Sequence, residues 1–425
     1  MSLRTLAVPG SCSTITAAPS WAVLWLLLLS ACGSKPIDET NGGGAGRPSI
    51  VAGAGGGGAT SQDGGSTSTA GASGAVSGGG SDGGGGAGSS GGKPGFAGGI
   101  TILDRIIMSS DESAAYHQNA AAPVDFGSEP VKRATLRIRL ESPCFPFEGW
   151  KAQITTAGHF WPDACDAFDR QFLISLDGVD GGVGNGMAPG IELTRAITPF
   201  GGPLSFETDV TDVVNGLRGQ HTLRIEIPTY SDSEGKVSGS KGSWIVSANL
   251  LLEPGTPPRE VLAVMPLVFA PQTSATPAPF AFTTPAGAGS ARIEYRATGH
   301  GLGTGAAPAC IGPAEEFCHR THALSLDGGQ PSTFDPWRTD CAALCTLTAN
   351  DSGNGIKQYC LENPCGALQS VRAPRANWCP GSVTPPHVLD GAALAEPGAH
   401  ELSLAIDELA EGGNWLVSAT FFAFK

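Results

Sequence analysis

The chain has 425 residues, with 25 basic and 39 acidic side chains that give a formal net charge of −14. A surface that binds nucleic-acid phosphates needs clustered Lys and Arg. No such cluster stands in the sequence, so nucleic acid is excluded as a partner.

The first apolar run covers residues 21–30 and is too short to span a bilayer, which takes roughly 20 residues. Small residues follow in "LSAC", which ends at Cys32. This pattern resembles a bacterial lipoprotein signal, with a signal peptide over residues 1–31 and a lipid on Cys32. The alternative is an ordinary secretory signal with a chance cysteine. Gly33 is not a retention-type Asp, so we expect an exported protein, anchored at the outer membrane or cell surface of a Gram-negative bacterium.

Residues 32–99 consist largely of Gly, Ser, Ala and Thr. A segment with so few large apolar side chains cannot bury enough surface to offset the entropy lost on ordering. We therefore predict a disordered tether between the lipidated cysteine and the folded part of the chain.

Strand patterns dominate from residue 100 onward. Apolar and polar residues alternate in "ATLRIRL" from Ala134, "HTLRIEI" from His221, "ARIEYRA" from Ala291 and "HELSLAI" from His400. Such alternation indicates strands with one buried face, and Gly and Pro separate the runs. Only "TDVVNGL" from Thr211 is compatible with a helical turn. The pattern predicts an all-β protein, most simply with an antiparallel sandwich in each half.

The two halves of this region repeat each other. "FLISLDG" from Phe172 matches "HALSLDG" from His322, and "GSWIVSANLLLEP" from Gly242 matches "GNWLVSATFFAFK" from Gly413. We expect an N-terminal domain over residues 100–256, a C-terminal domain over 257–425, and a ligand groove between them.

Three motifs stand in order along the two halves. They are "CDAFDR" from Cys165, "EEFCHRTH" from Glu315 and "RANWCPG" from Arg375. Together they resemble the bacterial peptide-N-glycosidase F family, whose members are amidases that remove N-linked glycans from asparagine. The resemblance covers most of residues 130–425. It implies two eight-stranded antiparallel jelly rolls packed side by side, an N-linked glycoprotein or glycopeptide substrate, and neither metal nor cofactor. We expect a monomer.

The resemblance also implies roles for individual residues. The family's catalytic Asp falls on Asp169, and its Glu before an aromatic residue and a Cys falls on Glu316. Carboxylates can deliver water to an amide carbonyl and a proton to the leaving amine when their environments separate their pKa values. Arg375 offers a planar fork of donors for a carboxylate or for substrate oxygens.

Aromatic and basic neighbours complete the expected site. Trp378 offers a face for a sugar ring and a surface against which a disulfide can pack. Arg170, Phe317 and Tyr230 are further candidates for substrate contact.

One departure from the family concerns a second site Glu. By simple alignment this Glu falls on Pro228, and the loop that follows, "PTYSDSEGKVSGSKG", is longer than usual. Asp232 and Glu234 are the candidate replacement carboxylates. The alternative function is therefore a catalytically impaired glycan-binding surface lipoprotein.

The pair His319 and His322 suggests a metal site at first sight. Residues three apart on a strand point to opposite faces, so we expect no convergence.

Eleven cysteines in an exported chain indicate disulfides. Spacing and the family pattern imply the bridges Cys144–Cys165, Cys310–Cys318 and Cys360–Cys379. Cys365 is then expected to pair with Cys341 or Cys345, and the sequence does not decide which.

Overall fold

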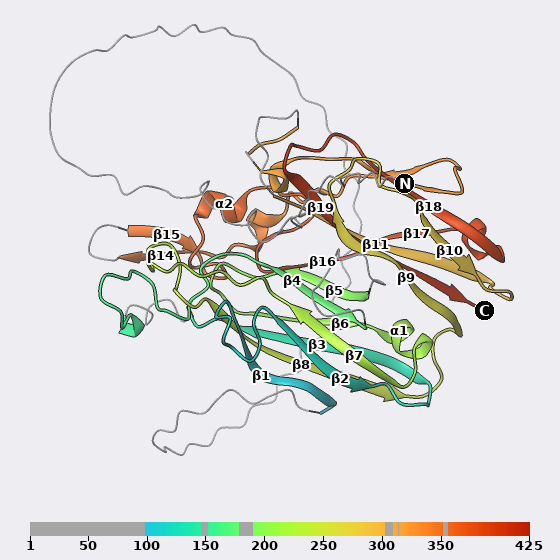
Figure 1. Ribbon diagram of the computed structural model, residues 1–425, viewed down its shortest axis with the longest axis horizontal. Coiled ribbons are helices and arrows are strands. Elements are labelled where there is room, and N and C mark those ends of the chain that lie inside the picture. The colour runs from blue at the N-terminus through green and yellow to red at the C-terminus, as the bar shows by residue number, and fades with distance from the viewer. Residues whose placement is uncertain (1–97, 146–151, 178–189, 302–308, 313, 352–355) are drawn as a thin grey trace, which may run out of the picture. The chain divides into compact units, whose positions relative to one another are not determined.

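Two facing sheets form the first half of the folded chain. The computed structural model describes residues 98–145, 152–177, 190–301, 309–312, 314–351 and 356–425. The strand orders are β1-β8-β3-β6 in one sheet and β16-β5-β4-β7-β2 in the other (Figure 1). The strands contributed by this half are β1 (Ile100–Ser109), β2 (Asn119–Asp125), β3 (Val131–Glu141), β4 (Gln171–Leu176), β5 (Ile191–Ile197), β6 (Leu204–Asp209), β7 (Gln220–Glu226) and β8 (Ser243–Pro254).

The second half repeats this arrangement. Its sheets have the orders β17-β11-β19-β9 and β10-β18-β12-β13, and a separate hairpin pairs β14 with β15. The strands are β9 (Val261–Gln272), β10 (Phe280–Thr284), β11 (Ser290–Gly301), β12 (His322–Leu326), β13 (Ser332–Phe334), β14 (Leu347–Asp351), β15 (Ile356–Cys360), β16 (Ser382–Thr384), β17 (His387–Asp390), β18 (Gly398–Ile406) and β19 (Gly413–Phe424).

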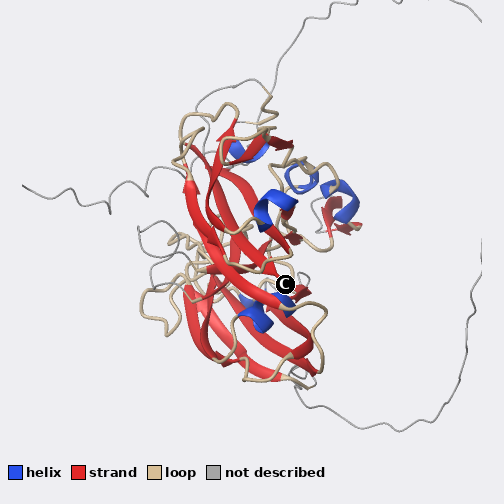
Figure 2. Ribbon diagram, turned by 90° about the vertical axis from the view of Figure 1, so that its right-hand side faces the viewer, coloured by secondary structure: helices blue, strands red, loops and turns tan. Residues whose placement is uncertain are grey.

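Helices are few and short among the described residues, as Figure 2 shows. They are α1 (Thr211–Gly216), η3 (Glu315–Phe317), η4 (Cys341–Leu344), α2 (Leu368–Arg372) and η5 (Ala392–Ala395). None of those helices has the length and apolar character required to cross a membrane. The prediction of an all-β protein built from jelly rolls is confirmed, and α1 occupies the one stretch that the sequence marked as helical.

The internal repeat includes a matching side-chain hydrogen bond in each half. In the first half, Asp177 accepts from His221 Nδ1 at 2.7 Å, and its backbone has a φ of 55°. In the second half, Asp327 accepts from His400 Nδ1 at 2.7 Å with a φ of 51°. Both aspartates stand in the "SLDG" motif that the sequence repeats. The same Asp–His hydrogen bond, Asp177–His221 in one half and Asp327–His400 in the other, therefore stabilises the same turn.

The two halves share polar and apolar contacts. Leu173 of β4 packs with Phe269 and Leu416 of the second half. Beside them the buried Arg195 pairs with Glu192 at 2.7 Å and donates to the Leu416 carbonyl at 2.6 Å. Residues 94–425 accordingly form one compact unit.

The expected boundary between residues 256 and 257 falls in the connection between β8 and β9. One strand departs from that division, because β16 of the second half pairs with β5 of the first. The expected signal peptide, the lipid on Cys32 and all but the last two residues of the tether lie outside the described residues.

Candidate active site

The segment that leads to Asp169 is fixed on both sides. Cys165 forms the expected disulfide with Cys144. Asp166 is buried and accepts from Arg170 Nε, with 3.1 Å between Nε and Oδ2. Strand β4 begins two residues after Asp169. The proposed catalytic carboxylate therefore stands on a short, anchored connection.

Glu316 comes from the opposite half, on the 3₁₀ helix η3. The expected bridge Cys310–Cys318 closes the loop that carries this helix. The carbonyl of Glu316 accepts from the Ala376 N–H at 2.8 Å. This bond ties the helix to the segment that bears Arg375.

Arg375 joins the two carboxylates. Its Nη1 donates to Glu316 Oε1 at 2.8 Å, and its Nη2 lies 4.0 Å from Asp169 Oδ2. The same Nη2 donates to the carbonyl and hydroxyl of Ser370 at 3.0 and 2.9 Å. Asp169, Glu316 and Arg375, which are far apart in the sequence, thus form one cluster.

Aromatic rings enclose the guanidinium of Arg375. Its central carbon lies 4.6 Å from the Phe317 ring centroid and 4.4 Å from the Trp378 ring centroid. Arg375 is 1% exposed and Trp378 is 2% exposed. The expectation that Trp378 offers a free face to a sugar is therefore wrong for this structure, because that side chain is buried against Arg375. Cation–π contact makes Trp378 a support for Arg375.

Burial dominates the electrostatics of the two carboxyl groups. It raises the pKa of Glu316 to about 7, where the charge of Asp169 also raises it and Arg375 lowers it. Burial likewise raises the pKa of Asp169, against the lowering effects of Arg375 and Arg170. Asp169 Oδ2 is also buried, with no hydrogen-bond partner within the described part of the chain. Near neutral pH this pair can hold a proton that isolated carboxyl groups would lose.

Arg170 and Tyr230 contact each other beside Asp169. The Arg170 guanidinium lies 5.1 Å from the Tyr230 ring centroid and 5.3 Å from that of Phe168. The Tyr230 N–H donates to Asp166 Oδ2 at 3.0 Å. Burial raises the pKa of Tyr230. These candidates for substrate contact therefore belong to the wall that supports Asp169.

The candidate replacement carboxylates do not join the cluster. Asp232 binds its own loop, because its oxygens accept from the backbone N–H groups of Lys236 at 2.7 Å and Val237 at 2.8 Å. Burial raises its pKa, but these bonds prevail and hold it below the ordinary value. Glu234 is exposed, and so is Pro228. The carboxylate of Asp232 is therefore engaged by its own loop, and its role as a replacement carboxylate stays a prediction.

The predicted disulfide Cys360–Cys379 is also wrong. Cys360 ends β15, whose pairing with β14 brings it to Cys345, with 5.0 Å between the Cα atoms. Cys379 instead pairs with Cys341 on η4, with 5.3 Å between the Cα atoms. The hairpin between the strands decides this pairing, and spacing alone did not reveal it.

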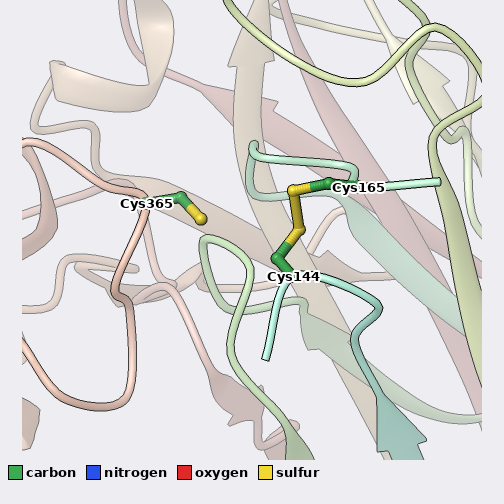
Figure 3. Close-up of side chains that lie close together, drawn as sticks. All are labelled: Cys144, Cys165 and Cys365. Atoms are coloured by element: carbon green, nitrogen blue, oxygen red, sulfur yellow. A yellow bond between two sulfur atoms is a disulfide. The ribbon is translucent and has the colours of Figure 1, made fainter. Parts of the chain in front are cut away.

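Cys365 is a free thiol, contrary to the expectation that it pairs with Cys341 or Cys345. Its N–H donates to the Phe200 carbonyl at 3.0 Å, which turns this residue toward the first half. Its sulfur lies within 4.8 Å of the sulfurs of Cys144 and Cys165 (Figure 3). Burial raises the pKa of the Cys365 thiol to about 12.

His319 and His322 diverge as expected. The exposed His319 stacks on Trp337, with 5.3 Å between ring centroids. His322 is buried, and its Nδ1 lies 2.9 Å from the Tyr295 hydroxyl.

Sequence reasoning missed two supporting residues. Glu315 is buried, pairs with Arg320 at 2.8 Å and accepts from the Trp415 indole at 2.9 Å. His300 stacks on Trp378, with 5.7 Å between ring centroids, and burial lowers its pKa to about 3. A Glu-Glu pair reads as solvated charge in sequence, so only the fold reveals that one member is a buried anchor.

A cavity of about 550 Å³ lies between the halves, near the N-terminal ends of β5 and β11. Its lining comes from both halves and includes Glu192, Asp212, Arg259, Arg292 and Arg296. None of the expected site residues lines it. This cavity is therefore separate from the carboxylate cluster.

Comparison with known proteins supports the sequence resemblance. Residues 270–422 match the family model of the peptide-N-glycosidase F C-terminal domain. Three solved structures share the fold. The crystal structure of peptide-N(4)-(N-acetyl-β-D-glucosaminyl)asparagine amidase has 18% identity and a TM-score of 0.55, covering 77% of this chain and 95% of that one.

PNGase F, a glycosylasparaginase from Flavobacterium meningosepticum, has 18% identity and a TM-score of 0.54 with the same coverage. PNGF-II has 18% identity and a TM-score of 0.55, and the match covers 76% of this chain and 65% of that one. A comparison with curated proteins gave no match.

The fold defines a double jelly-roll protein with a partly buried carboxylate pair, one member from each half. More particularly, residues 270–422 match the C-terminal domain of peptide-N-glycosidase F, and the fold of the chain is similar to that of the PNGase F structures.

Proposed function

We propose that this protein is an amidase that hydrolyses the asparagine–GlcNAc amide of N-linked glycoproteins or glycopeptides. The products are aspartate and a glycosylamine. The observation that carries the proposal is the meeting of Asp169 and Glu316, one from each half, on the guanidinium of Arg375.

Asp169 is the principal catalytic carboxylate in this proposal. As a base it takes a proton from water, whose oxygen attacks the amide carbonyl carbon. The C–N bond then breaks as Asp169 returns this proton to the departing nitrogen of the glycosylamine. Glu316, whose pKa burial raises to about 7, retains a proton near neutral pH and can hydrogen-bond to the water or a sugar hydroxyl. Arg375 fixes the distance between the two carboxyl groups. The reaction requires neither metal nor cofactor.

The N-terminal sequence completes the proposal. A lipid on Cys32 and the Gly-rich segment after it would hold a monomeric enzyme at the outer membrane or cell surface, with its site directed to extracellular glycoproteins. The pattern of apolar run, small residues and cysteine supports this location.

Pro228 favours the second candidate function, a glycan-binding surface lipoprotein with impaired catalysis. This exposed residue stands where the family has a site Glu, and Asp232 is committed to its own loop. Asp169, Glu316 and Arg375 favour hydrolysis.

The test is incubation of the protein with a denatured N-glycoprotein, followed by measurement of released glycan and of the change in gel mobility. We expect release by the wild type and a loss on the order of 10²-fold to 10⁴-fold in Asp169→Asn. Glu234→Gln, which removes an exposed carboxylate, is the matched control and should keep full activity. Absence of release by the wild type, with glycan binding retained, would establish the second function instead.

A further inference from the structure

Apart from Tyr230, the long loop between β7 and β8, residues 227–242, has no role in the chemistry above, yet it contacts the segment that carries Asp169. We propose that this loop is a clamp that positions the catalytic carboxylate, and that Ser238 is its central positioning residue. The inference rests on the proposed function for its catalytic consequence.

Ser238 connects the loop to the residues just before Asp169. Its hydroxyl accepts from the Ala167 N–H at 3.0 Å and donates to the Cys165 carbonyl at 3.1 Å. The Gly239 N–H donates to the same carbonyl at 2.8 Å. Ser238 is fully buried, so water does not substitute for these bonds. The loop thereby fixes the backbone from one side while the disulfide to Cys144 fixes it from the other.

Further bonds extend the contact along the loop. The Lys241 N–H donates to the Asp163 carbonyl at 2.7 Å, and the Phe160 N–H donates to the Gly235 carbonyl at 2.7 Å. The Trp161 indole donates to the Lys236 carbonyl at 3.2 Å. The loop and residues 160–167 therefore pair over most of their lengths.

Two glycines make the close approach possible. A Cβ on Gly239 would lie 2.3 Å from the Pro162 carbonyl oxygen, so any side chain there would push the two segments apart. Gly235 has a φ of 58° and faces the ring of His159, where a Cβ would lie 2.4 Å from Cγ. These two positions therefore require glycine.

Asp232 organises the clamp from within. Its carboxylate accepts from the N–H groups of Glu234, Lys236 and Val237 at 3.1, 2.7 and 2.8 Å. These bonds hold the loop in the shape that presents Ser238. The long loop that follows Pro228 thus has a structural role, and this role does not require a replacement carboxylate.

The test uses the full chain with Ser238→Ala and Asp232→Ala, and Ser233→Ala as the matched control. Ser233 is exposed on the same loop. Hydrogen–deuterium exchange followed by mass spectrometry reports the amides of residues 164–170, and steady-state kinetics on an N-glycopeptide reports kcat and KM.

We expect both clamp variants to exchange these amides at least about tenfold faster, because Ala167 or the whole loop loses its anchor. We expect kcat to fall roughly tenfold to a hundredfold with KM within about twofold of wild type, since misplacement of a catalytic group acts on the chemical step. The control should match wild type in both measurements.

Unchanged exchange in both variants would overturn the clamp. Faster exchange with unchanged kcat would overturn its role in positioning Asp169. A wild-type chain that releases no glycan contradicts the proposed function, and the exchange measurement then decides whether the loop fixes this segment.

Discussion

Arg375 Nη1 donates to Glu316 Oε1 at 2.8 Å, and this bond lies where the two halves of the protein meet. The other arm of the guanidinium reaches Ser370 and lies 4.0 Å from Asp169. One buried arginine thereby sets the geometry of both carboxyl groups. The planar shape of the guanidinium is as important as its charge, because it donates hydrogen bonds to Glu316 and Ser370 and also contacts two aromatic rings.

Arg375→Lys should therefore be a severe change although it keeps the charge. An ammonium cannot reach Glu316 and Ser370 together, and it stacks poorly between Phe317 and Trp378. We expect kcat to fall roughly tenfold to a hundredfold. Arg372→Lys on the exposed surface of α2 is the control for steady-state kinetics. Equal activity of the two variants would contradict this role.

The raised pKa of Glu316 predicts a pH dependence of stability. Its ordinary pKa is 4.5, and burial raises it to about 7 in the folded chain. Between these values the folded state binds the proton more tightly than the unfolded state, so this group contributes less stability as the pH rises through that window. Urea unfolding of wild type and Glu316→Gln from pH 4.5 to 7.5 should show this slope in the wild type alone, beyond the slope common to both. Glu234→Gln, on an exposed site, should retain the wild-type slope.

Glu315 carries a different prediction, for stability alone. Its carboxylate satisfies Arg320 and accepts from the N–H groups of Trp415 and Ala410 in a buried site. Glu315→Ala leaves the Arg320 guanidinium buried without that counter-charge, which should cost about 3–5 kcal/mol. Denaturant titration measures the loss. Glu408→Ala, at an exposed position, should stay within about 0.5 kcal/mol of wild type.

The Asp327–His400 hydrogen bond predicts a second dependence of stability on pH, whose sign follows from the raised pKa of His400. The Glu396 carbonyl and the Asp327 carboxylate both bind the His400 ring and raise its pKa above the ordinary 6.5. The stabilisation is fully present below pH 6.5 and is lost as the pH rises through the raised value. Calorimetry should therefore show that His400→Asn lowers Tm more at pH 5.5 than at pH 8.5. A larger loss at pH 8.5 than at pH 5.5 for His400→Asn would reverse the argument.

The Cys365 thiol should resist alkylation in the folded protein. Burial raises its pKa to about 12, so the reactive thiolate is scarce at pH 8. Iodoacetamide followed by peptide mass spectrometry should find Cys365 unlabelled in buffer and labelled after unfolding in guanidinium without reductant. Rapid labelling of this peptide in buffer would contradict the raised pKa of the thiol.

Alternation of apolar residues was enough to predict the sheets, because each strand has one face in a core and the pattern follows directly from that burial. Thus "HELSLAI" became β18, with His400, Leu402, Leu404 and Ile406 buried along one face. The repeat of "SLDG" likewise predicted the same turn in each half, since this turn needs the same Asp with a left-handed backbone.

The site was less predictable, because its support depends on burial and on contacts distant in sequence. Trp378 was expected to offer a face to a sugar, but its indole ring contacts Arg375 and stacks on His300 of β11. The pairing of Cys345 with Cys360 follows from the hairpin of β14 and β15. Turn residues between those two short segments were the signal that could have predicted this bridge.

The pairing of β16 with β5 has a consequence for how the chain is made. Ser382 lies opposite Ile197 and Thr384 opposite Arg195, so the edge of the first half's sheet is covered only by a strand synthesised much later. An uncovered edge is a template for pairing with other chains. During folding the first half keeps that edge open until residues 382–384 have reached it. The sheet of the first half is therefore complete only once the second half has folded against it, so the two halves finish folding together.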